Sequence, residues 1–570
     1  MLTATIISAF LATAQAAVLP RATTYTVTVG ALGSWGNPDD TPAASYIDKD
    51  GKYYYQSAHA LYGANDGRSW SFFSGSTMDD ATKIAISTAA NPANPLDSNG
   101  DTTWRCNNSP TGKKATKAAG STSYAQANYC DLAGVWVDPD TGDWYGLVHN
   151  EFTPQPFGDG LHYDSIDVTV SRDQGKTWTI TDQAITSPYS TVRADTTSFP
   201  GQTYYYGDGD PRIHVDISSG YFYVWYGSRV VNKGGYGGSW VAFHEHVARA
   251  PISGKMAAGT WQKFYNGGWT EAGLGGKESN LVPTSQSAVG YTPPAKEYNP
   301  LTQGTAQQQI ANGQAPATSP LFVMDVSYNA YLGIWIAEPQ AVDQSGNAPQ
   351  EIYYTTNLET QQWTLLGNTG SYHTASWYRW FLDSTSKTSS AIVGKSFRAY
   401  CSFGCSGGKS SEYVNIAIES SNPFQAIDTT KSYTIGAAGA FLTDSASKAT
   451  SAAAGAKYTF KATGDGAYTI QNASGGFLGV ASTTTATRAW GTVPAISTGS
   501  AGVGQQWWVI QSKGGATFRL VNRYSGLVLA LSGTQGRLAE TTPARSWDSN
   551  GSGVGGGRKA AEQELVLTAA

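Results

Sequence analysis

Residues 207–226 read GDGDPRIHVDISSGYFYVWY and set the pattern on which the chain is built. An acidic, glycine-rich entry leads into an apolar strand, an Asp-x-x-x-Gly turn and an aromatic strand that runs back. Strand, tight turn and strand form a β-hairpin, and aspartate and glycine are the residues that such turns require. The stretch therefore predicts a hairpin that turns between Asp216 and Gly220.

The same pattern recurs four more times. The copies are 43–56 (AASYIDKDGKYYYQ), 134–148 (GVWVDPDTGDWYGLV), 321–336 (LFVMDVSYNAYLGIWI) and 377–400, which has a longer turn. The fourth copy is aligned on Asp325, and in that alignment it has no glycine at its turn. Repeats that continue into further strands are typical of β-propeller blades rather than of a sandwich. The sequence predicts an all-β fold with a propeller over residues 22–427, which has five blades or, as an alternative, six.

Two short motifs support the propeller. Residues 171–178, SRDQGKTW, fit the Asp-box pattern S-x-D-x-G-x-x-W, and residues 63–70, GANDGRSW, are a degenerate copy. The region thus resembles sialidase-like propellers, in which such a box joins the outer strands of a blade. The five units, with an aspartate before the first strand, also resemble the five-bladed propellers of glycoside hydrolase family 43 and its relatives.

A second kind of repeat fills residues 431–570. Short strands alternate with Ala, Gly, Ser and Thr, and Gln505-Gln506-Trp507 is similar to the Q-x-W signature of ricin-type β-trefoil domains. That resemblance implies a carbohydrate-binding domain, with Asp444 and Trp507 as sugar-binding candidates. Most of the family's cysteines and Asp-Gly motifs are missing, so we expect some of its three sugar sites to be inactive.

The N-terminus and the cysteines indicate secretion. Residues 1–16 are apolar and end in an Ala-x-Ala pattern, as in a signal peptide. The four cysteines suggest local pairing, Cys106 with Cys130 and Cys401 with Cys405, although other connectivities remain open. Glycosylation sequons begin at Asn107, Asn472 and Asn550.

Composition limits the partners. The 570 residues carry a net charge of −5, and only 14% of them are charged. This balance gives no electrostatic case for binding nucleic acid or an acidic membrane surface. With 33 tyrosines and 18 tryptophans, the chain has the composition of a secreted β-protein that binds sugars. We expect a monomer whose partner is a polysaccharide or oligosaccharide.

The hairpins gather polar residues at one rim. Because their strands are antiparallel, the start of each first strand and the end of each second strand lie at the same end of the propeller. Alignment on the turn aspartates places several acidic residues at the starts of first strands: Asp40, Asp131, Asp208 and Asp210. At the ends of second strands it places His59, Glu151, Arg229 and Glu338.

Carboxyl groups from different blades at one rim are what glycoside hydrolysis requires, one to donate a proton and one to activate water or attack carbon. The resemblance to family 43 implies that Asp40 is the base and Asp210 tunes the acid. Glu151 is the candidate acid, although the family's acid usually stands on the third blade, where this chain has Asp210. Candidate substrate-binding residues are His149, Arg212, Arg229, Glu338, His373 and Arg379. No metal-ligand set is predicted, and no cofactor is certain, but a structural Ca²⁺ in the channel is left open.

These features predict a secreted glycoside hydrolase acting on a plant or microbial wall polysaccharide, with an arabinose-containing glycan favoured. A polysaccharide lyase is one alternative, in which His149 and Tyr163 remove a proton from a uronic acid while Arg212 neutralises its carboxylate. A lectin with two binding modules and no activity is another. The sequence leaves the sugar and its linkage undetermined.

Overall fold

The computed structural model describes residues 23–60, 67–111, 129–152, 163–192, 194–234, 240–340, 346–512, 514–549 and 557–570. In these residues the α-helices are short, α1 (Thr103–Asn108) and α2 (Ala306–Ala311), and strands dominate. No helix in the described ranges is long and apolar enough to cross a membrane.

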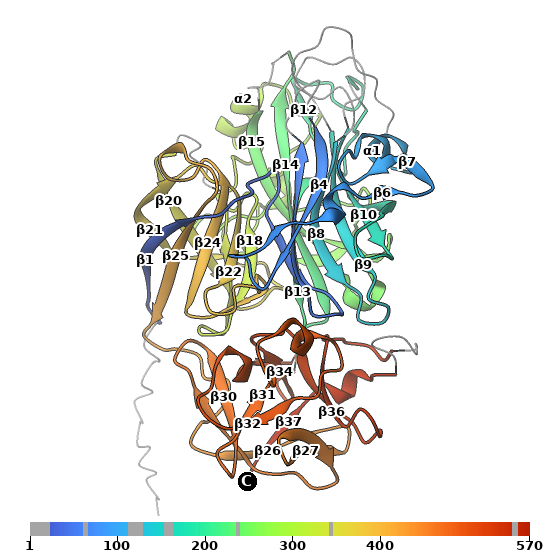
Figure 1. The fold of residues 1–570 in the computed structure, drawn as a ribbon. Helices are drawn as coiled ribbons and strands as arrows, with labels where there is room; N and C mark the ends of the chain where they lie inside the picture. The colour runs from blue at the N-terminus through green and yellow to red at the C-terminus, as the bar shows by residue number, and fades with distance from the viewer. Residues whose placement is uncertain are drawn as a thin grey trace, which may run out of the picture.

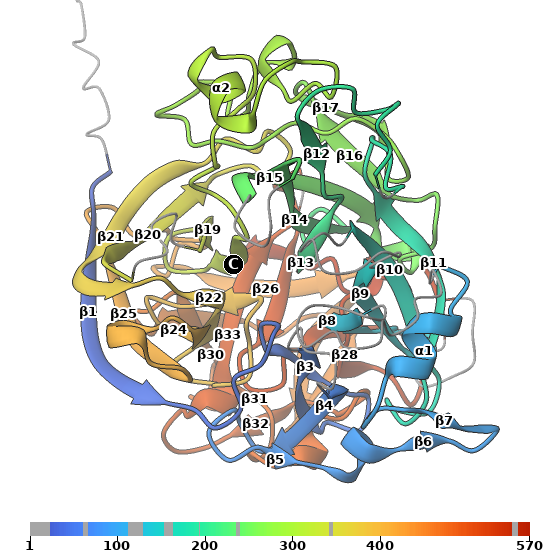
Figure 2. The ribbon, with the colours of Figure 1, turned by 90° about the horizontal axis from the view of Figure 1, so that it is seen from above.

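Five β-sheets stand around a common axis in the N-terminal part (Figures 1 and 2). Blade one contains β2 (Ala44–Ile47), β3 (Tyr53–Ala60), β4 (Arg68–Gly75) and β5 (Thr82–Lys83). Blade two contains β8 (Tyr129–Val137), β9 (Trp144–Phe152), β10 (Tyr163–Ser171) and β11 (Thr179–Thr186). A small hairpin of β6 (Ala90–Asn91) and β7 (Asn94–Ser98) lies between them in sequence.

The other three blades are larger or are completed by distant strands. Blade three contains β12 (Thr203–Tyr205), β13 (Gly209–Asp216), β14 (Tyr221–Asn232), β15 (Trp240–Pro251), β16 (Gln262–Tyr265) and β17 (Gly268–Ala272). Blade four contains β18 (Asp325–Asn329), β19 (Ile334–Glu338), β20 (Ala348–Thr355), β21 (Thr364–Thr374) and β23 (Ile392–Val393). Blade five contains β22 (Trp377–Asp383), β24 (Ser396–Phe403), β25 (Glu412–Ser420) and β1 (Tyr25–Ser34). The predicted all-β, five-bladed propeller is confirmed.

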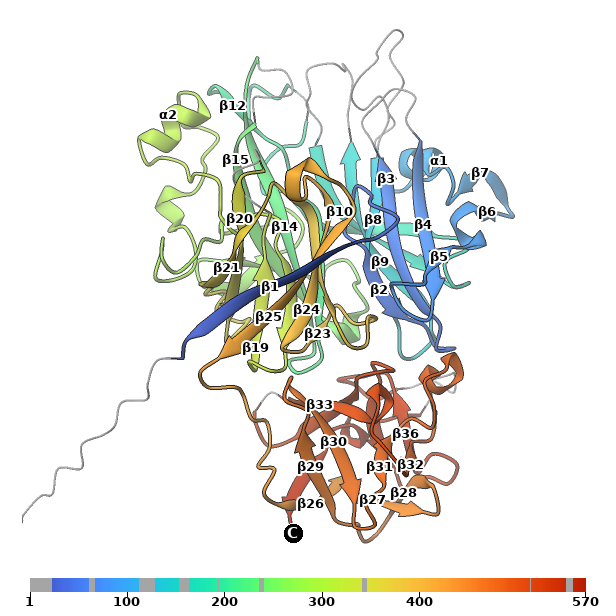
Figure 3. The same ribbon diagram turned by 60° about the vertical axis from the view of Figure 1, so that its left-hand side comes forward.

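Strand β1 closes the ring. It pairs antiparallel with β25, with Val27 opposite Ile418 (Figure 3). Each neighbouring pair of blades, including the fifth and the first, shares a hydrophobic cluster. Since β1 precedes blade one in the sequence but completes blade five, pairing of the propeller's first and last strands closes the ring and covers the edge of β25.

The hairpin turns form as the sequence predicts in the first three units. Gly51, Gly142 and Gly220 have φ values of +83°, +75° and +78°, a conformation that side chains with a Cβ rarely adopt. The blade-two Asp box is also a turn, between β10 and β11: the Ser171 hydroxyl accepts a hydrogen bond from the Gly175 backbone N–H at 2.8 Å. Of the degenerate copy, residues 63–66 lie outside the described residues.

The fourth hairpin corrects the alignment. The turn runs from Asn329 to Gly333, whose φ is +70°, and the Gly333 N–H donates to the Asn329 carbonyl at 2.8 Å. Asn329 replaces the usual turn aspartate, because its side-chain oxygen can accept a backbone bond in the same way. The prediction that this unit turns at Asp325 without glycine is therefore wrong. Asp325 begins β18, at the other end of the hairpin.

A separate twelve-stranded sheet system follows the propeller and forms the predicted β-trefoil. Its strands are β26 (Ser432–Ala437), β27 (Ala440–Ser445), β28 (Lys448–Ala452), β29 (Tyr458–Ala462), β30 (Ala467–Asn472), β31 (Phe477–Gly479), β32 (Ala495–Ser497), β33 (Gln506–Gln511), β34 (Phe518–Asn522), β35 (Val528–Leu531), β36 (Ala539–Thr542) and β37 (Val566–Ala569). Trp507 lies in its core, fully buried, and donates its indole N–H to the Leu478 carbonyl at 2.9 Å.

The trefoil packs against the end of the propeller at which all five hairpins turn (Figures 1 and 3). Its contacts with the turns of blades one, two and five are the Trp490 N–H to the Lys49 carbonyl, Arg545 to Asp140 and Arg523 to Asp383. It also contacts the turns of blades three and four: Ser546 lies against Gly220, and Ala330 joins an apolar cluster with Trp508. The rim that carries the acidic residues is the opposite end of the propeller.

The two predicted disulfides are present, Cys106–Cys130 and Cys401–Cys405. The first links α1 to the start of β8, and the second closes the loop that follows β24.

Candidate active site

The rim opposite the trefoil collects charged side chains from every blade. Acidic residues lie at or near the starts of innermost strands in blades one to four: Asp40, Asp131, Asp210 and Asp325. The second strands end there with Glu151 on β9, Arg229 on β14 and Glu338 on β19. The strand pairing that defines the blades therefore brings together residues that are far apart in the sequence, as expected.

Asp40 and Asp210 are linked through Tyr378 on β22, the innermost strand of blade five. The Tyr378 hydroxyl donates to Asp210 Oδ1 at 3.5 Å and also hydrogen-bonds the Asp40 carboxyl group. Both Asp210 and Tyr378 have positive φ values, +52° and +54°. Such backbone strain in residues with side chains is concentrated at functional sites, where the surrounding structure maintains it.

His149 and Arg229 hold the acidic groups together. His149 Nε2 lies 3.5 Å from Asp164 Oδ2 and 3.7 Å from Glu151 Oε1, and its Nδ1 lies 3.7 Å from Asp210 Oδ1. Arg229 contacts Asp164 at 3.2 Å and Asp210 at 2.5 Å. All five side chains are buried, so this network is shielded from solvent. We call it the rim cluster and include in it Asp40 and Tyr378.

The rim cluster separates the protonation states of Asp40 and Asp210. Arg229, His149 and Arg212 hold the pKa of Asp210 below its usual value, in spite of its burial. Burial raises the pKa of Asp40 to about 8, and the negative charges of Glu151 and Asp210 add to the effect. At neutral pH Asp40 therefore carries a proton while Asp210 is ionised, which is the separation that acid–base catalysis uses.

This result bears on the roles expected from the sequence. Asp40 was expected to act as the base, but a carboxyl group whose pKa is raised to about 8 is suited to donate a proton. The charge of Asp210 raises the pKa of Asp40. Glu151 lies close enough to Asp40 to raise the same pKa.

A metal ion fits the rim cluster poorly. The ligand atoms of His149, Glu151 and Asp164 lie within 4.8 Å of one another. Ca²⁺ requires six to eight oxygen ligands, however, and Arg229 already supplies positive charge to Asp164. The carboxylates of Asp164, Asp210 and Glu151 raise the pKa of His149 to about 10, in spite of its burial.

The remaining substrate-binding candidates lie in different surroundings. Arg212 is buried under the ring of Tyr378, with its guanidinium carbon 5.3 Å from the ring centre. Glu338 and Arg379 form their own buried ion pair at 2.6 Å, where burial raises the pKa of Glu338 to about 7. His373 is exposed on β21 opposite Pro349, and it is not among the residues that the rim cluster brings together.

The sugar-binding candidates of the trefoil, Trp507 and Asp444, also lie in different surroundings. Trp507 is a core residue rather than a contact at the edge of a sugar site. Asp444 is half-buried and accepts a hydrogen bond from the Asn472 amide at 3.2 Å. The Asn472 side-chain nitrogen, to which an N-linked glycan would be attached, is therefore buried and hydrogen-bonded. We expect no glycosylation at Asn472. Asn107 is half-buried on α1, and Asn550 lies outside the described residues.

Sequence reasoning missed Tyr378 and Asp164. Tyr378 follows Trp377 in an aromatic strand and looks like a core residue, while Asp164 sits beside Tyr163 at the start of a third strand, which the hairpin alignment did not cover. A search of the residues at the start of the innermost strand of blade five would have found Tyr378. Asp164 is identified only by its contacts with His149 and Arg229.

Comparisons with known proteins agree with the two-part architecture. The family model "Ricin-type beta-trefoil lectin domain-like" matches residues 454–547, which confirms the resemblance of the C-terminal part to that family. No curated protein matches the chain.

Among solved structures, a GH43 β-1,3-galactosidase aligns over 94% of this chain and 93% of its own, with 10% identity and a TM-score of 0.31. The catalytic domain of a GH62 α-L-arabinofuranosidase from Coprinopsis cinerea aligns over 71% of this chain and 99% of its own, with 12% identity and a TM-score of 0.32. An exo-β-1,3-galactanase from Clostridium thermocellum aligns over 80% of this chain and 99% of its own, with 16% identity and a TM-score of 0.21. The structures that this chain resembles thus include glycosidases.

Proposed function

We propose that the protein is a secreted glycoside hydrolase whose reaction takes place at the rim cluster and whose trefoil holds it on a polysaccharide. The observation that carries the proposal is the meeting of Asp40, Glu151 and Asp210 from three blades, linked by Tyr378, His149 and Arg229. An apolar propeller axis has no structural need of such a set, because buried charges are costly.

Proton transfer is assigned to Asp40 and Glu151. Asp40 donates its proton to the glycosidic oxygen as the bond to the anomeric carbon breaks. Glu151 supplies the second carboxylate, which either removes a proton from the attacking water or attacks the anomeric carbon itself, and product stereochemistry separates these routes. Asp210 remains ionised, and its charge helps to keep the proton on Asp40 until substrate arrives.

The substrate we favour is a plant or microbial wall polysaccharide that contains arabinose. This choice rests on the resemblance of the five hairpin units to family 43 propellers. The ricin-type trefoil supports a saccharide partner in general. Two disulfides are consistent with an oxidising, extracellular location.

The lyase alternative loses support at His149. A lyase base must be able to accept a proton, but the pKa of His149 is raised to about 10 by three neighbouring carboxylates. The pKa of the Tyr163 hydroxyl is also raised, by burial, which makes deprotonation harder. The lectin alternative is separated from an enzyme by the experiment below.

The test is a screen of the secreted protein on wall polysaccharides, with chromatography of the products and ultraviolet detection. A hydrolase releases reducing sugars without new absorbance, whereas a lyase creates an absorbing double bond. Glycan binding with no product after long incubation would overturn the enzyme proposal in favour of a lectin.

A further inference from the structure

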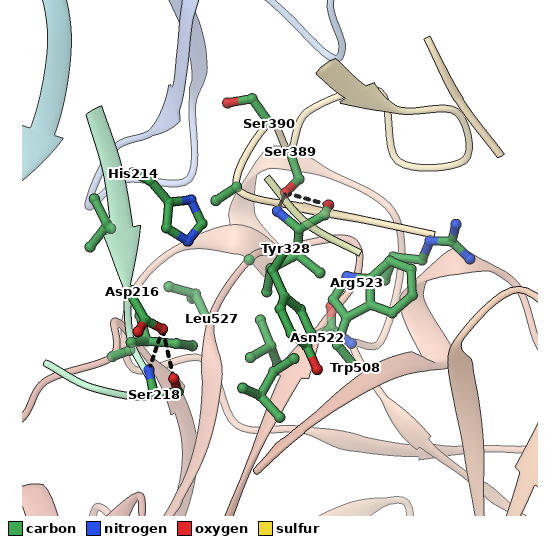
Figure 4. Close-up of a pocket in the computed structure, with 18 of the residues that line it drawn as sticks. His214, Asp216, Ser218, Tyr328, Ser389, Ser390, Trp508, Asn522, Arg523 and Leu527 are labelled. Carbon is green, nitrogen blue, oxygen red and sulfur yellow. Dashed lines mark hydrogen bonds between the residues drawn. The ribbon is translucent and has the colours of Figure 1, made fainter. Parts of the chain in front are cut away.

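A large cavity lies between the turn end of the propeller and the trefoil, remote from the rim cluster. Its volume is about 430 Å³, within the range of about 300–1,000 Å³ found for ligand sites, which often lie between domains. His214 and Asp216, at the end of β13, line one side (Figure 4). Trp508 and Asn522, from the trefoil, line the opposite side.

The walls of this junction cavity are held in place by contacts between the two domains. Arg523 donates to Asp383 of the propeller at 2.7 and 3.1 Å and to Asp465 of the trefoil at 2.6 Å. Arg545 donates to Asp140 at 2.7 Å. Because these side chains are largely buried, the two domains form a fixed interface, and the space between them is a preformed cavity.

The charged groups that line the junction cavity are already satisfied. Asp216 accepts hydrogen bonds from the Ser218 backbone and hydroxyl groups at 3.0 and 2.7 Å, and Arg523 is committed to its two aspartates. Burial lowers the pKa of His214, so its ring is neutral at physiological pH. The cavity therefore offers no unpaired charge to a uronic acid, a phosphate or an amine.

What remains is a set of half-buried aromatic rings with polar edges. Tyr328 and Trp335 of blade four meet edge to face with ring centres 5.4 Å apart. Trp136 and Trp490 line the same cavity and are also half-buried. The lining also carries polar side chains, among them His214, Ser389 and Asn522.

We propose that the junction cavity binds a short neutral oligosaccharide, held by both domains at once. A sugar ring presents an apolar C–H face to an aromatic ring and hydroxyl groups at its edge, and the lining offers both kinds of contact without charge. The site differs from the rim cluster and from the Asp444 region of the trefoil. The proposal is independent of the proposed reaction, because it requires the cavity to bind a sugar and not to cleave one.

The test measures binding to the full chain carrying Glu151→Gln, so that no probe is consumed. Arabinotriose, xylotriose and galactotriose are titrated calorimetrically and soaked at millimolar concentration into crystals. We expect one of them to occupy the junction cavity. Trp335→Ala should weaken its binding by roughly tenfold or more, since an aromatic face is lost. Tyr328→Phe, which keeps the shape, should weaken it by about threefold to tenfold.

Matched controls are Trp269→Ala, a half-buried tryptophan on β17 outside the cavity, and Asp444→Ala in the trefoil, both expected to leave this binding unchanged. Thermal melts identify any variant that fails to fold. If Trp335→Ala fails to fold, the binding measured for Tyr328→Phe decides the result. An empty cavity with all three probes, or binding that neither cavity variant weakens, would overturn the proposal. Failure of hydrolysis by the parent chain would not affect it.

Discussion

The two ends of the propeller use charge in opposite ways. At the turn end, Arg523 places all of its guanidinium nitrogens in hydrogen bonds, and its partner Asp383 is equally buried. At the rim, Asp40 has a buried oxygen with no hydrogen-bond partner, and two nitrogens of Arg212 also lack one among the described residues. The fully bonded Arg523 helps to fix the trefoil in place, whereas unsatisfied buried groups such as those of the rim lower stability. We expect the rim to bear this cost for the sake of its chemistry.

The largest expected effect concerns the rim. Glu151→Gln keeps the shape of the side chain and removes the carboxylate, so turnover should fall by roughly 10²- to 10⁴-fold while the fold is retained. Asp167→Asn is the control, because Asp167 is a buried carboxyl group of the same blade that bonds Asn150 and Thr111 outside the rim cluster. Initial rates on the active polysaccharide measure both. Near-normal activity in Glu151→Gln would move the assignment to Asp131 and Glu338.

The turn end should respond in stability. Arg523→Met leaves Asp383 buried without its partner, which typically costs about 3–5 kcal/mol in unfolding free energy. Denaturant unfolding measures the loss, and Lys431→Met, which removes an exposed ion pair with Asp428, should change little. After limited proteolysis near residues 425–435, the two fragments should stay associated in the parent chain and separate more readily in Arg523→Met. Equal stability of both variants would refute a fixed interface.

The burial of Asp40 should make the stability of the protein depend on pH. Its pKa is about 8 in the folded protein and near 4 when unfolded, so folding takes up a proton between these values and stability falls as pH rises through that window. Asp40→Asn removes the penalty. At pH 8 its unfolding free energy should exceed that of the parent chain by on the order of a few kcal/mol, and its melting temperature should be higher. Near pH 4 the two proteins should be equally stable. A gap that is the same at both pH values would contradict the shifted pKa.

The smallest effect is expected from Tyr378→Phe. The hydroxyl hydrogen-bonds Asp40 and Asp210, and its loss should reduce kcat/KM by about tenfold. Since this bond lowers the pKa of Asp40, the alkaline limb of the pH profile should also shift to higher pH. Tyr145→Phe, at the turn end of β9 in blade two, is the control. A drop in rate without any shift would assign Tyr378 a structural role only.

The hairpins were predictable because a turn needs local residue types that a sequence displays directly. Alignment on those turns was enough to place Asp40, Asp210 and Glu151 at one rim, since antiparallel pairing fixes which ends meet. It fails in blade four, where Asn329 replaces the turn aspartate and Asp325 begins the strand instead. Side-chain direction and charge state depend on contacts across blades. The proton on Asp40, the bridge from Tyr378 and the burial of Trp507 were therefore out of reach.

The central claim, that Asp40 donates the proton, is tested most directly by the pH dependence of kcat/KM on the active polysaccharide. Only the protonated form of Asp40 can donate, and its pKa is raised to about 8. The account predicts that kcat/KM stays high through neutral pH and falls as pH rises past about 8, and that Asp40→Asn abolishes this alkaline limb together with most of the activity. A profile that already falls above about pH 5, near the ordinary carboxyl range, would contradict it.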